Sequence, residues 1–374
     1  MIRPKIVIAF LGNISFDSRS RNLFVSLTDN GYDPSFIGFD WLTRDFVSVR
    51  DDNIYVKKLS KRISVIFYLK FAFLLTFKLF QSNAKFYLAE DIYTLPFVAF
   101  VSYFKKAKVI YDSREIYAHL AGLSKRKKVQ AFWRWIEKTF IKSVYVILTT
   151  GEMDSAFIEK EYNLKETIII RNLPLDKEIS ESFDFRDYYK LSKDKIILLY
   201  QGVILPGRGL NIIFEVMNRL ENCVLVILGD GEYKEHCQKT VREKKLEDKV
   251  FFLGKVNQND LLKHTSGADI GLAIIENLSL SYYYALPNKM FEYIYCGLPV
   301  IASNLPQMKA IIDRYQVGLT VNAENDKEII DAINLLVNDE EQRNKFISNC
   351  RTASLELNWG NEIKKLFSFL ETMN

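Results

Sequence analysis

The sequence predicts an α/β protein built from two doubly wound, parallel-sheet domains in tandem. Its 374 residues are enough for two domains of ordinary size. Short β-rich runs alternate with helical stretches in both halves, which is the pattern of βαβ units and a parallel sheet. A polar stretch near residues 172–194 separates the two sets of strands. We therefore expect an N-terminal domain over residues 1–175 and a second domain over residues 190–352.

Composition excludes several classes of protein. A hydrophobic fraction of 48% is ordinary for a folded protein and excludes a disordered or collagen-like chain. The four cysteines form no CxxC pair, so we expect a reducing compartment and neither a zinc site nor a disulfide framework. The opening MIRPKIVIAFLGN reads as a strand and a turn rather than a signal peptide, which predicts a cytoplasmic location.

The expected strands determine where site residues should lie. In the first half they are KIVIAFLG, PSFIGFD, KFYLAED, KVIYDS and VYVILTT. In the second half they are KIILLYQG, CVLVILGDG, KVFFLGKV, DIGLAII and LPVIAS. Ligands of doubly wound sheets bind at the carboxyl ends of the strands. Residues that directly follow these runs are therefore the candidates for binding and chemistry.

Positive charge is concentrated in the first half. Residues 57–142 hold 18 Lys and Arg against 5 Asp and Glu, although the whole chain carries a net charge of only +5. This asymmetry predicts an anionic partner, either nucleic acid or an anionic membrane surface.

Two segments of this region combine basic and aromatic residues. One begins at Lys57 and ends at Phe80, and its run ISVIFYLKFAFLLTFKLF contains two lysines on nearly the same helical face. This suits an amphipathic helix better than a membrane-spanning one, and the helix either packs on a sheet or lies at a membrane interface. The other begins at Lys125 and ends at Trp135, and it reads as a solvated basic loop or as a second segment of the same kind. Two such segments favour a membrane surface over nucleic acid.

Three glycine-containing motifs follow strands of the second half. In YQGVILPGRGL, Gly202 follows a strand and Gly209 precedes a helix, where backbone N–H groups and the planar fork of Arg208 would bind phosphate. The motif LGDGEY places Gly229 and Gly231 at the next strand end. The motif FFLGKV follows, and its candidates for backbone contact with a base are Leu253, Gly254 and Val256. Each motif alone also reads as an ordinary turn or strand exit.

A fourth motif, ALPNKMFEYIYCGLPVIAS, is the most specific. Asn288 and Lys289 begin a helix, and Glu292 lies on its first turn. Lys289 and the helix N-terminus would face phosphate, while the carboxylate of Glu292 would accept both ribose hydroxyls. A capped helix with an early acid explains Glu292 alone, but not the order of all four motifs.

In this order the motifs resemble the donor domain of GT-B glycosyltransferases, closest to the retaining family 4 type. The resemblance covers roughly residues 196–321. It implies two Rossmann-like domains facing a cleft, with a final helical segment over residues 353–374 that returns to the N-terminal domain. The chain departs from the family at Tyr284, where a first glutamate is usual, and at Val203, where an arginine is usual. Its LPNK sequence resembles a subgroup in which a Pro-x-Lys loop replaces that glutamate.

The first half resembles the acceptor domain of these enzymes at the ends of three strands. The sequence DSRSRNLF resembles the DxR-x-R helix start of the family, and it also reads as an ordinary capped helix. Two later strand ends, YLAED and VIYDSRE, carry further polar residues, with Arg114 where relatives often have histidine. The acceptor-side candidates are Gly12, Asn13, Asp17, Arg19, Asp91, Asp112, Arg114 and Glu115.

The resemblance implies a hexosyltransferase that moves a sugar, with retention, from a nucleotide diphosphate sugar to a saccharide or lipid-linked acceptor. UDP is the expected nucleotide. Arg208, Lys289 and helix N-termini would stabilise the leaving diphosphate, with Glu292 as the further catalytic candidate of the donor side. Asp91, Asp112 and Glu115 would orient the acceptor hydroxyl. No DxD-type motif stands out, so we expect no metal and no other cofactor. With the basic segments, this predicts a peripheral enzyme of surface polysaccharide or glycolipid synthesis at the inner face of the cell membrane, without a nucleic acid partner.

Two other interpretations remain. A nucleotide-sugar 2-epimerase shares the fold, but it needs paired acids and bases in the cleft and no membrane-binding segment. A non-catalytic relative that binds nucleotide or nucleic acid is opposed by the intact Arg208, Lys289 and Glu292, because a decayed site would lose these residues first.

Overall fold

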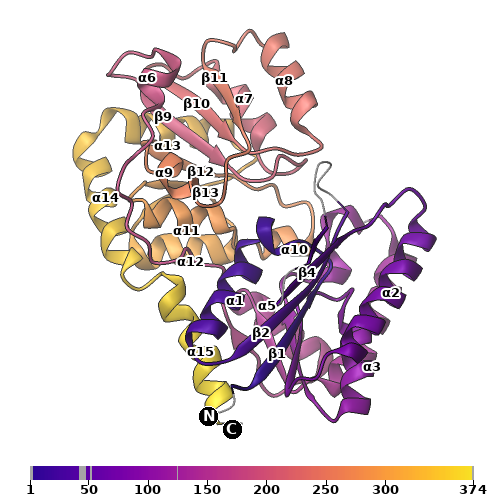
Figure 1. Cartoon of the computed structure of the whole chain (residues 1–374). Coiled ribbons are helices and arrows are strands. Elements are labelled where there is room, and N and C mark those ends of the chain that lie inside the picture. The colour runs from indigo at the N-terminus through magenta and orange to yellow at the C-terminus, as the bar shows by residue number, and fades with distance from the viewer. Residues whose placement is uncertain (1–2, 42–47, 51–52, 124, 373–374) are drawn as a thin grey trace. The chain divides into compact units, whose positions relative to one another are not determined.

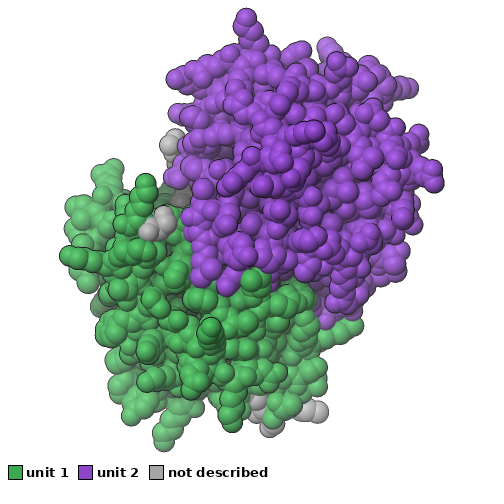
Figure 2. All heavy atoms as spheres, turned by 180° about the vertical axis from the view of Figure 1, so that it is seen from behind, with its two compact units in different colours: residues 1–172, 363–374 green, residues 173–362 purple. Residues whose placement is uncertain are grey.

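The computed structural model describes residues 3–41, 48–50, 53–123 and 125–372. The chain divides into two compact units, residues 1–172 with 363–374 and residues 173–362 (Figure 2). Each unit holds one sheet with helices packed on it (Figure 1). The predicted α/β fold with two doubly wound units is therefore confirmed.

The first unit is built on an eight-stranded sheet. Its strands are β1 (Lys5–Phe10), β2 (Asp33–Asp40), β3 (Val49–Arg50), β4 (Ile54–Lys58), β5 (Phe86–Ala89), β6 (Lys108–Ser113), β7 (Val146–Thr149) and β8 (Ile168–Ile169). Their order is β3–β4–β2–β1–β5–β6–β7–β8, and only the β3–β4 pair is antiparallel. Because β1, β5 and β6 are parallel neighbours, the polar residues that follow them meet at one edge of the sheet.

Helices pack on both faces of this sheet. They are α1 (Ser18–Asp29), α2 (Ser64–Gln81), α3 (Leu95–Lys105), α4 (Lys127–Phe140), α5 (Glu152–Tyr162) and most of α15 (Trp359–Glu371). Figure 1 shows α1 on one face and α2 and α3 on the other. In α15, the ring of Phe367 stacks on the ring of Tyr32, with the ring centroids 6.1 Å apart. The Nζ of Lys365 donates a hydrogen bond to the carbonyl of Ile169 at 3.1 Å. The terminal helix thus returns to the N-terminal unit.

The second unit is built on a six-stranded sheet whose neighbours are all parallel. Its strands are β9 (Ile196–Gln201), β10 (Cys223–Leu228), β11 (Val250–Gly254), β12 (Ile270–Ala273), β13 (Val300–Ser303) and β14 (Gly318–Val321), in the order β11–β10–β9–β12–β13–β14. Its helices are α6 (Phe185–Tyr189), α7 (Leu210–Met217), α8 (Lys234–Glu243), α9 (Leu261–Thr265), α10 (Leu280–Tyr283), α11 (Asn288–Tyr295), α12 (Pro306–Tyr315), α13 (Asp326–Asn338) and α14 (Glu340–Ser354).

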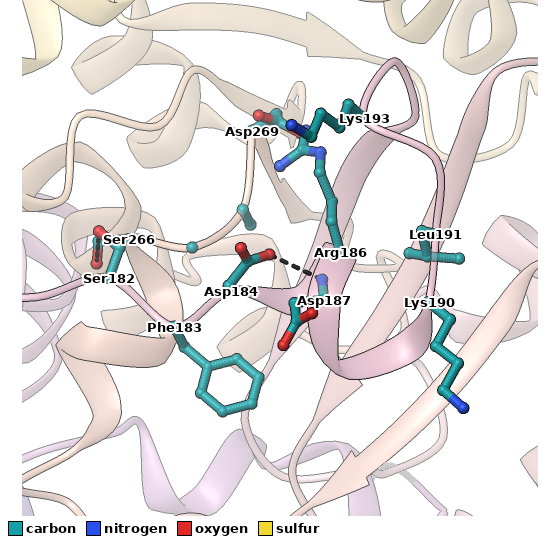
Figure 3. Close-up of a pocket in the computed structure, with 12 residues that line it drawn as sticks. Ser182, Phe183, Asp184, Arg186, Asp187, Lys190, Leu191, Lys193, Ser266 and Asp269 are labelled. Carbon is teal, nitrogen blue, oxygen red and sulfur yellow. Dashed lines mark hydrogen bonds and ion pairs between the residues drawn. The ribbon is translucent and has the colours of Figure 1, made fainter.

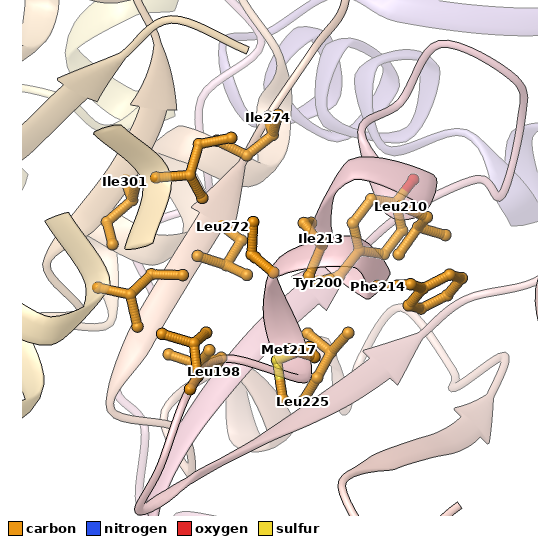
Figure 4. Close-up of a cluster of buried hydrophobic side chains, with 14 of the residues drawn as sticks. Leu198, Tyr200, Leu210, Ile213, Phe214, Met217, Leu225, Leu272, Ile274 and Ile301 are labelled. Atoms are coloured by element: carbon orange, nitrogen blue, oxygen red, sulfur yellow. The ribbon is translucent and has the colours of Figure 1, made fainter. Parts of the chain in front are cut away.

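The core of the second unit fixes the loop that follows β9. Figure 4 shows Tyr200 of β9 beside Leu210, Ile213 and Phe214 of α7, and Leu198 of β9 next to Met217 of the same helix. All six side chains are at most 2% exposed. Since burial of large apolar side chains is the main stabilising term in a fold, this contact holds the start of α7 against the end of β9.

The polar stretch between the two sets of strands packs on the second unit. Leu173 and Phe185 are buried in its core, and Arg186 of α6 pairs with Asp269 at 2.5 Å. The division between the units falls after Asn172, at the start of the polar stretch. The polar stretch belongs to the second unit because it carries apolar side chains, such as Leu173 and Phe185, that the core of this unit buries.

Candidate functional site

The carboxyl edge of the second sheet brings the three glycine motifs together. The N–H of Gly202 donates to the carbonyl of Leu228 at 2.9 Å, and the N–H of Gly229 donates to that of Gly254 at 2.8 Å. A Cβ on Gly229 would lie 1.9 Å from the carbonyl oxygen of Gly202, so only glycine permits this approach. The edge therefore presents backbone without side chains on three neighbouring strands, β9, β10 and β11.

The loop between β9 and α7 places Arg208. Gly209 directly precedes α7 with φ 79°, and a Cβ there would lie 2.6 Å from the carbonyl oxygen of Ile274. The guanidinium carbon of Arg208 lies 4.8 Å from the centre of the Tyr282 ring. The Tyr282 hydroxyl donates to the carbonyl of Pro206 at 3.3 Å. The loop is thus held against the end of β12 and against α10.

Lys289 lies in the first turn of α11, and its amine is buried. Nζ is 3.8 Å from the centre of the Tyr200 ring, and it has no hydrogen-bond partner within the described part of the chain. Burial, and then the positive charge of Arg208, lower the pKa of Lys289 well below its usual range. A buried ammonium without a partner costs free energy, which a bound anion would offset. Lys289 is therefore the strongest indication of an anionic ligand at this edge.

Glu292 lies one turn further along α11. Gln201, the last residue of β9, donates to it through Nε2, and the Oε1 of Gln201 accepts the Thr265 hydroxyl at 2.7 Å. Burial raises the pKa of Glu292 to about 7, against the opposing effects of Gln201 and Lys289. Gln201 is a site residue that the sequence analysis missed. The available signal was a polar side chain that ends the otherwise apolar run IILLYQ.

The other donor-side candidates surround these groups. Asn288 is exposed at the first position of α11. The side chains of Leu253 and Val256 pack on the core of the unit. Gly231 follows β10, and a Cβ there would lie 2.2 Å from the carbonyl oxygen of Ile204. These residues therefore shape the edge through backbone and packing.

A buried ion pair lies at the carboxyl edge of the first sheet. Arg19 of α1 donates through Nε and Nη2 to the two carboxylate oxygens of Asp112, each at 2.7 Å. Its Nη1 donates to the carbonyl of Ile170 at 2.6 Å. Both side chains of the pair are almost completely buried. The donors of Arg19 are thus engaged within the protein.

Arg114 connects this pair to two further carboxylates. Its guanidinium lies 2.9 Å from Asp17, 3.1 Å from Glu90 and 3.3 Å from Asp112. Asp17 also caps α1 by accepting the N–H of Ser20 at 2.8 Å, so the capped-helix interpretation holds. Burial raises the pKa of Glu90 to about 7, against the positive charge of Arg114. We name Asp17, Arg19, Glu90, Asp112 and Arg114 the ionic cluster.

The remaining acceptor-side candidates hold the turns beside the ionic cluster. Asp91 is buried and accepts the N–H groups of Leu11 at 2.8 Å and Thr94 at 2.7 Å. Asn13 donates to Asp40 at 2.8 Å.

Two candidates lie at the margins of this edge. A Cβ on Gly12 would lie 2.1 Å from the ring of Phe10, so a side chain there would displace the ring. Glu115 is exposed after the end of β6. Within the described ranges, no group of three or more His, Cys, Asp and Glu side chains is arranged to hold a metal ion.

A separate pocket of about 940 Å³ opens on the second unit (Figure 3). Residues 182–193 and 266–269 contribute its lining, including Arg186 and Asp269. Arg186 donates to the carbonyl of Lys195 at 2.8 Å, directly before β9, so the pocket lies at the amino ends of the strands. The predicted donor-side residues lie at the opposite, carboxyl edge.

Comparison with known proteins adds sequence and fold relatives. Residues 181–353 match the model of the family described as glycosyl transferases group 1. A chitobiosyldiphosphodolichol beta-mannosyltransferase of Debaryomyces hansenii is 24% identical over 259 residues, which cover 60% of this chain and 54% of the relative. The chain thus spans about half the length of the curated relatives it matches.

Two solved structures share the fold over the whole chain. Sucrose-phosphate synthase (tll1590) from Thermosynechococcus elongatus superposes with a TM-score of 0.80 at 15% identity, covering 99% of each chain. Anabaena Alr3699/HepE in complex with UDP and glucose superposes with a TM-score of 0.71 at 13% identity, covering 99% of this chain and 100% of the other. At these identities the likeness establishes the fold.

Proposed function

Because this chain has the GT-B fold and residues 181–353 match the model of the glycosyl transferases group 1 family, we propose that it transfers a sugar from a nucleotide diphosphate sugar to an acceptor. The observation that carries the proposal is the buried amine of Lys289, which has no hydrogen-bond partner among the described residues and whose pKa is lowered by the charge of Arg208. These two cations stand at a sheet edge where three glycine turns expose backbone. That combination fits a diphosphate.

The chemistry follows from where charge develops. In glycosyl transfer the bond between the sugar and the diphosphate breaks, so negative charge builds on the leaving diphosphate. Arg208 and Lys289 stabilise that charge, and Lys289 does so when it carries a proton. Glu292, held by Gln201, accepts the ribose hydroxyls of the nucleotide. The two cations supply the positive charge, so the proposal includes no metal ion.

We propose UDP as the nucleotide and retention at the transferred sugar. The related HepE structure is a complex with UDP and glucose, which supports the choice of nucleotide. Retention rests on the resemblance of the motifs to the retaining family 4 type, and a retaining transfer in which the leaving phosphate takes the acceptor proton needs no protein base. In the first unit, Arg114 and Asp17 are the members of the cluster with partly exposed side chains, and they would orient the acceptor hydroxyl.

We further propose that the acceptor is a saccharide carried by a lipid, and that the enzyme acts at the inner face of the cell membrane in surface polysaccharide or glycolipid synthesis. The concentration of Lys and Arg between residues 57 and 142 supports this location.

A thermal-shift screen tests the donor assignment first. The protein is heated with UDP, GDP, ADP, CDP and their common sugar conjugates, alongside Glu292→Ala and Lys289→Met. At about a hundred times its Kd, a ligand stabilises the fold by about 2.7 kcal/mol. We expect a response to UDP compounds that both variants lose and that Lys345→Met, an exposed lysine of α14, retains. No response from a folded protein to any nucleotide contradicts the donor site.

Release of UDP from a responding UDP-sugar tests the reaction itself. We expect release to depend on added acceptor, with the sugar recovered on the acceptor. Conversion of the UDP-sugar to an isomer without transfer would instead identify a 2-epimerase.

A further inference from the structure

The helix α2 is apolar on two opposite faces. Its inward row, Phe67, Phe71, Leu75 and Leu79, is at most 1% exposed and belongs to the core of the first unit. A second row begins two residues earlier, at Val65, and repeats every four residues through Phe77. Two residues correspond to a rotation of about 200° around a helix, so this second row points away from the sheet. Nothing within the described part of the chain covers it, and Phe73 in this row is 70% exposed.

Neighbouring helices extend this apolar surface. On α3, Phe100 and Phe104 contact Phe80 of α2, with ring centroids 6.3 Å apart in each case. On α4, Trp133 joins the surface through Tyr93, which stacks on Tyr68 of α2. We name this surface the α2–α3–α4 face; its large apolar residues, all at least 45% exposed, are Val65, Ile66, Leu69, Phe73, Phe77, Phe80, Phe100, Tyr103, Phe104, Phe132 and Trp135.

The charge of the three helices has one sign at the surface. They contain seven Lys and Arg residues and a single acidic residue, Glu137. Glu137 is buried and accepts the hydroxyls of Tyr111 and Tyr162, each at 2.6 Å. The exposed ionic groups of these helices are therefore all cationic, and of the basic residues Arg134 is paired with Glu161 of α5.

We propose that the α2–α3–α4 face docks on an anionic lipid bilayer, with its apolar side chains in the interfacial region and its Lys and Arg residues among the headgroups. This composition is that of an interfacial, membrane-surface helix. A second copy of the chain would bring the same positive charges against this face. Nucleic acid would satisfy the charges but would leave aliphatic side chains such as Val65 and Leu69 in water.

The fold also determines how α2 meets the bilayer. Within the described ranges, α2 is the one helix long and apolar enough to cross a membrane by length and composition. A spanning α2 would have to leave the sheet, which would expose Phe67, Phe71, Leu75 and Leu79 and open the core of the unit. The helix therefore lies along the bilayer surface and stays in the fold.

Aromatic contacts link the docking face to Tyr93 and Tyr117, which lie close in sequence to Glu90 and Arg114 of the ionic cluster in the same unit. Tyr93, which contacts Trp133 at 4.9 Å, follows the buried Asp91 by two residues and also contacts Tyr117 at 6.0 Å. Tyr117 in turn follows Arg114 by three residues. This part of the inference rests on the proposed transferase function: a docked enzyme would present the cluster to saccharides attached to lipids in the same bilayer.

Vesicle flotation tests the docking independently of activity. We expect the full chain to float with vesicles of phosphatidylcholine and phosphatidylglycerol in equal parts, and to bind them at least tenfold more tightly than vesicles of phosphatidylcholine alone. Leu69→Glu with Phe73→Glu should reduce binding at least tenfold. Lys70→Gln with Lys127→Gln and Lys128→Gln should reduce it about a hundredfold, and added salt should act in the same direction. The matched control is Leu355→Glu, an exposed apolar residue of the second unit.

The results that would contradict docking on a bilayer differ from one another, and each has its own explanation. A folded protein that does not float overturns the proposal, as does equal loss in the Leu355→Glu control. Protein that remains with vesicles in alkaline carbonate would show a spanning helix instead. Self-association in ultracentrifugation that Leu69→Glu abolishes, without flotation, would assign the face to a second copy. If the variant that does not float still transfers sugar to a soluble acceptor, the proposed transferase function stands although docking is lost. Failure of docking and failure of the proposed function can therefore be told apart.

Discussion

The amine of Lys289 lies 3.8 Å from the centre of the Tyr200 ring and has no hydrogen-bond partner in the described part of the chain. A tyrosine ring stabilises a cation only modestly, so the fold retains a buried basic group that its own residues leave incompletely satisfied. Arg208 adds a second positive charge nearby. We therefore expect the ligand that completes this arrangement to be anionic.

Replacing Lys289 by methionine should separate binding from folding. We expect Lys289→Met to weaken UDP binding by about tenfold to a hundredfold, since hydrogen bonds to charged groups contribute about 1.5–3 kcal/mol. The same change should leave the free energy of unfolding unchanged or raise it, because it removes a buried cation. Calorimetric titration and urea unfolding measure the two effects. A less stable variant with unchanged UDP affinity would show that Lys289 serves the fold.

The stability of the first unit should depend on pH through Glu90. Its pKa in the folded protein is about 7, above its ordinary value of 4.5, so the folded protein keeps a proton that the unfolded chain releases. The stabilising contribution is complete below pH 4.5 and is lost as the pH rises to about 7. We expect a decline on the order of 3 kcal/mol in the free energy of unfolding across this range.

Urea unfolding at a series of pH values measures this decline. Glu90→Gln should flatten it, whereas Glu166→Gln, an exposed glutamate of the same unit, should not. The quantity to compare is the slope of the unfolding free energy against pH. The absolute free energy is less informative, because the substitution also changes a contact with Arg114. An identical slope in the wild-type protein and in Glu90→Gln would contradict the assignment.

Gly229→Ala should damage the donor edge directly. The added Cβ would lie 1.9 Å from the carbonyl oxygen of Gly202, which forces two turns apart. We expect a loss of about 2–4 kcal/mol in stability together with loss of the thermal response to UDP. Gly122→Ala is the matched control, since a Cβ there meets nothing within 4 Å. Wild-type stability in Gly229→Ala would mean that the turns at Gly202 and Gly229 can move apart without a cost in free energy.

Asp112→Asn should be among the most destabilising changes in the first unit. It would leave the guanidinium of Arg19 buried without its carboxylate, and breaking a buried pair in this way costs about 3–5 kcal/mol. Asp326→Asn breaks the exposed pair with Arg219 and should cost at most about 1 kcal/mol. Urea unfolding of both variants gives the comparison. Similar losses in the two would show that Arg19 finds other partners.

The sequence predicted those parts of the fold that depend on local pattern. Apolar runs between helical stretches identified most strands, because strands of parallel sheets are buried on both faces. The strand β4 was not predicted, since two of its five residues are lysine. The segment that begins at Lys125 had a basic loop as one interpretation, and the structure shows that residues 127–140 form a helix.

Prediction of the site was limited by contacts that are distant in sequence. The glycine motifs and the Lys289–Glu292 turn stood out because backbone conformation and helix starts leave local signals. Gln201 did not, because its importance comes from a partner 91 residues away, Glu292. The apolar contribution of α3 was missed for the same reason: its exposure depends on how three helices pack.

The return of α15 has a consequence for synthesis on the ribosome. Leu366 and Leu370, both fully buried, belong to the unit that begins at residue 1. The second unit has all of its residues, 173–362, before this last helix is complete. The unit whose residues emerge first therefore needs a helix that emerges after the second unit, and a nascent chain must keep the surface that receives α15 uncovered until that helix has been synthesised.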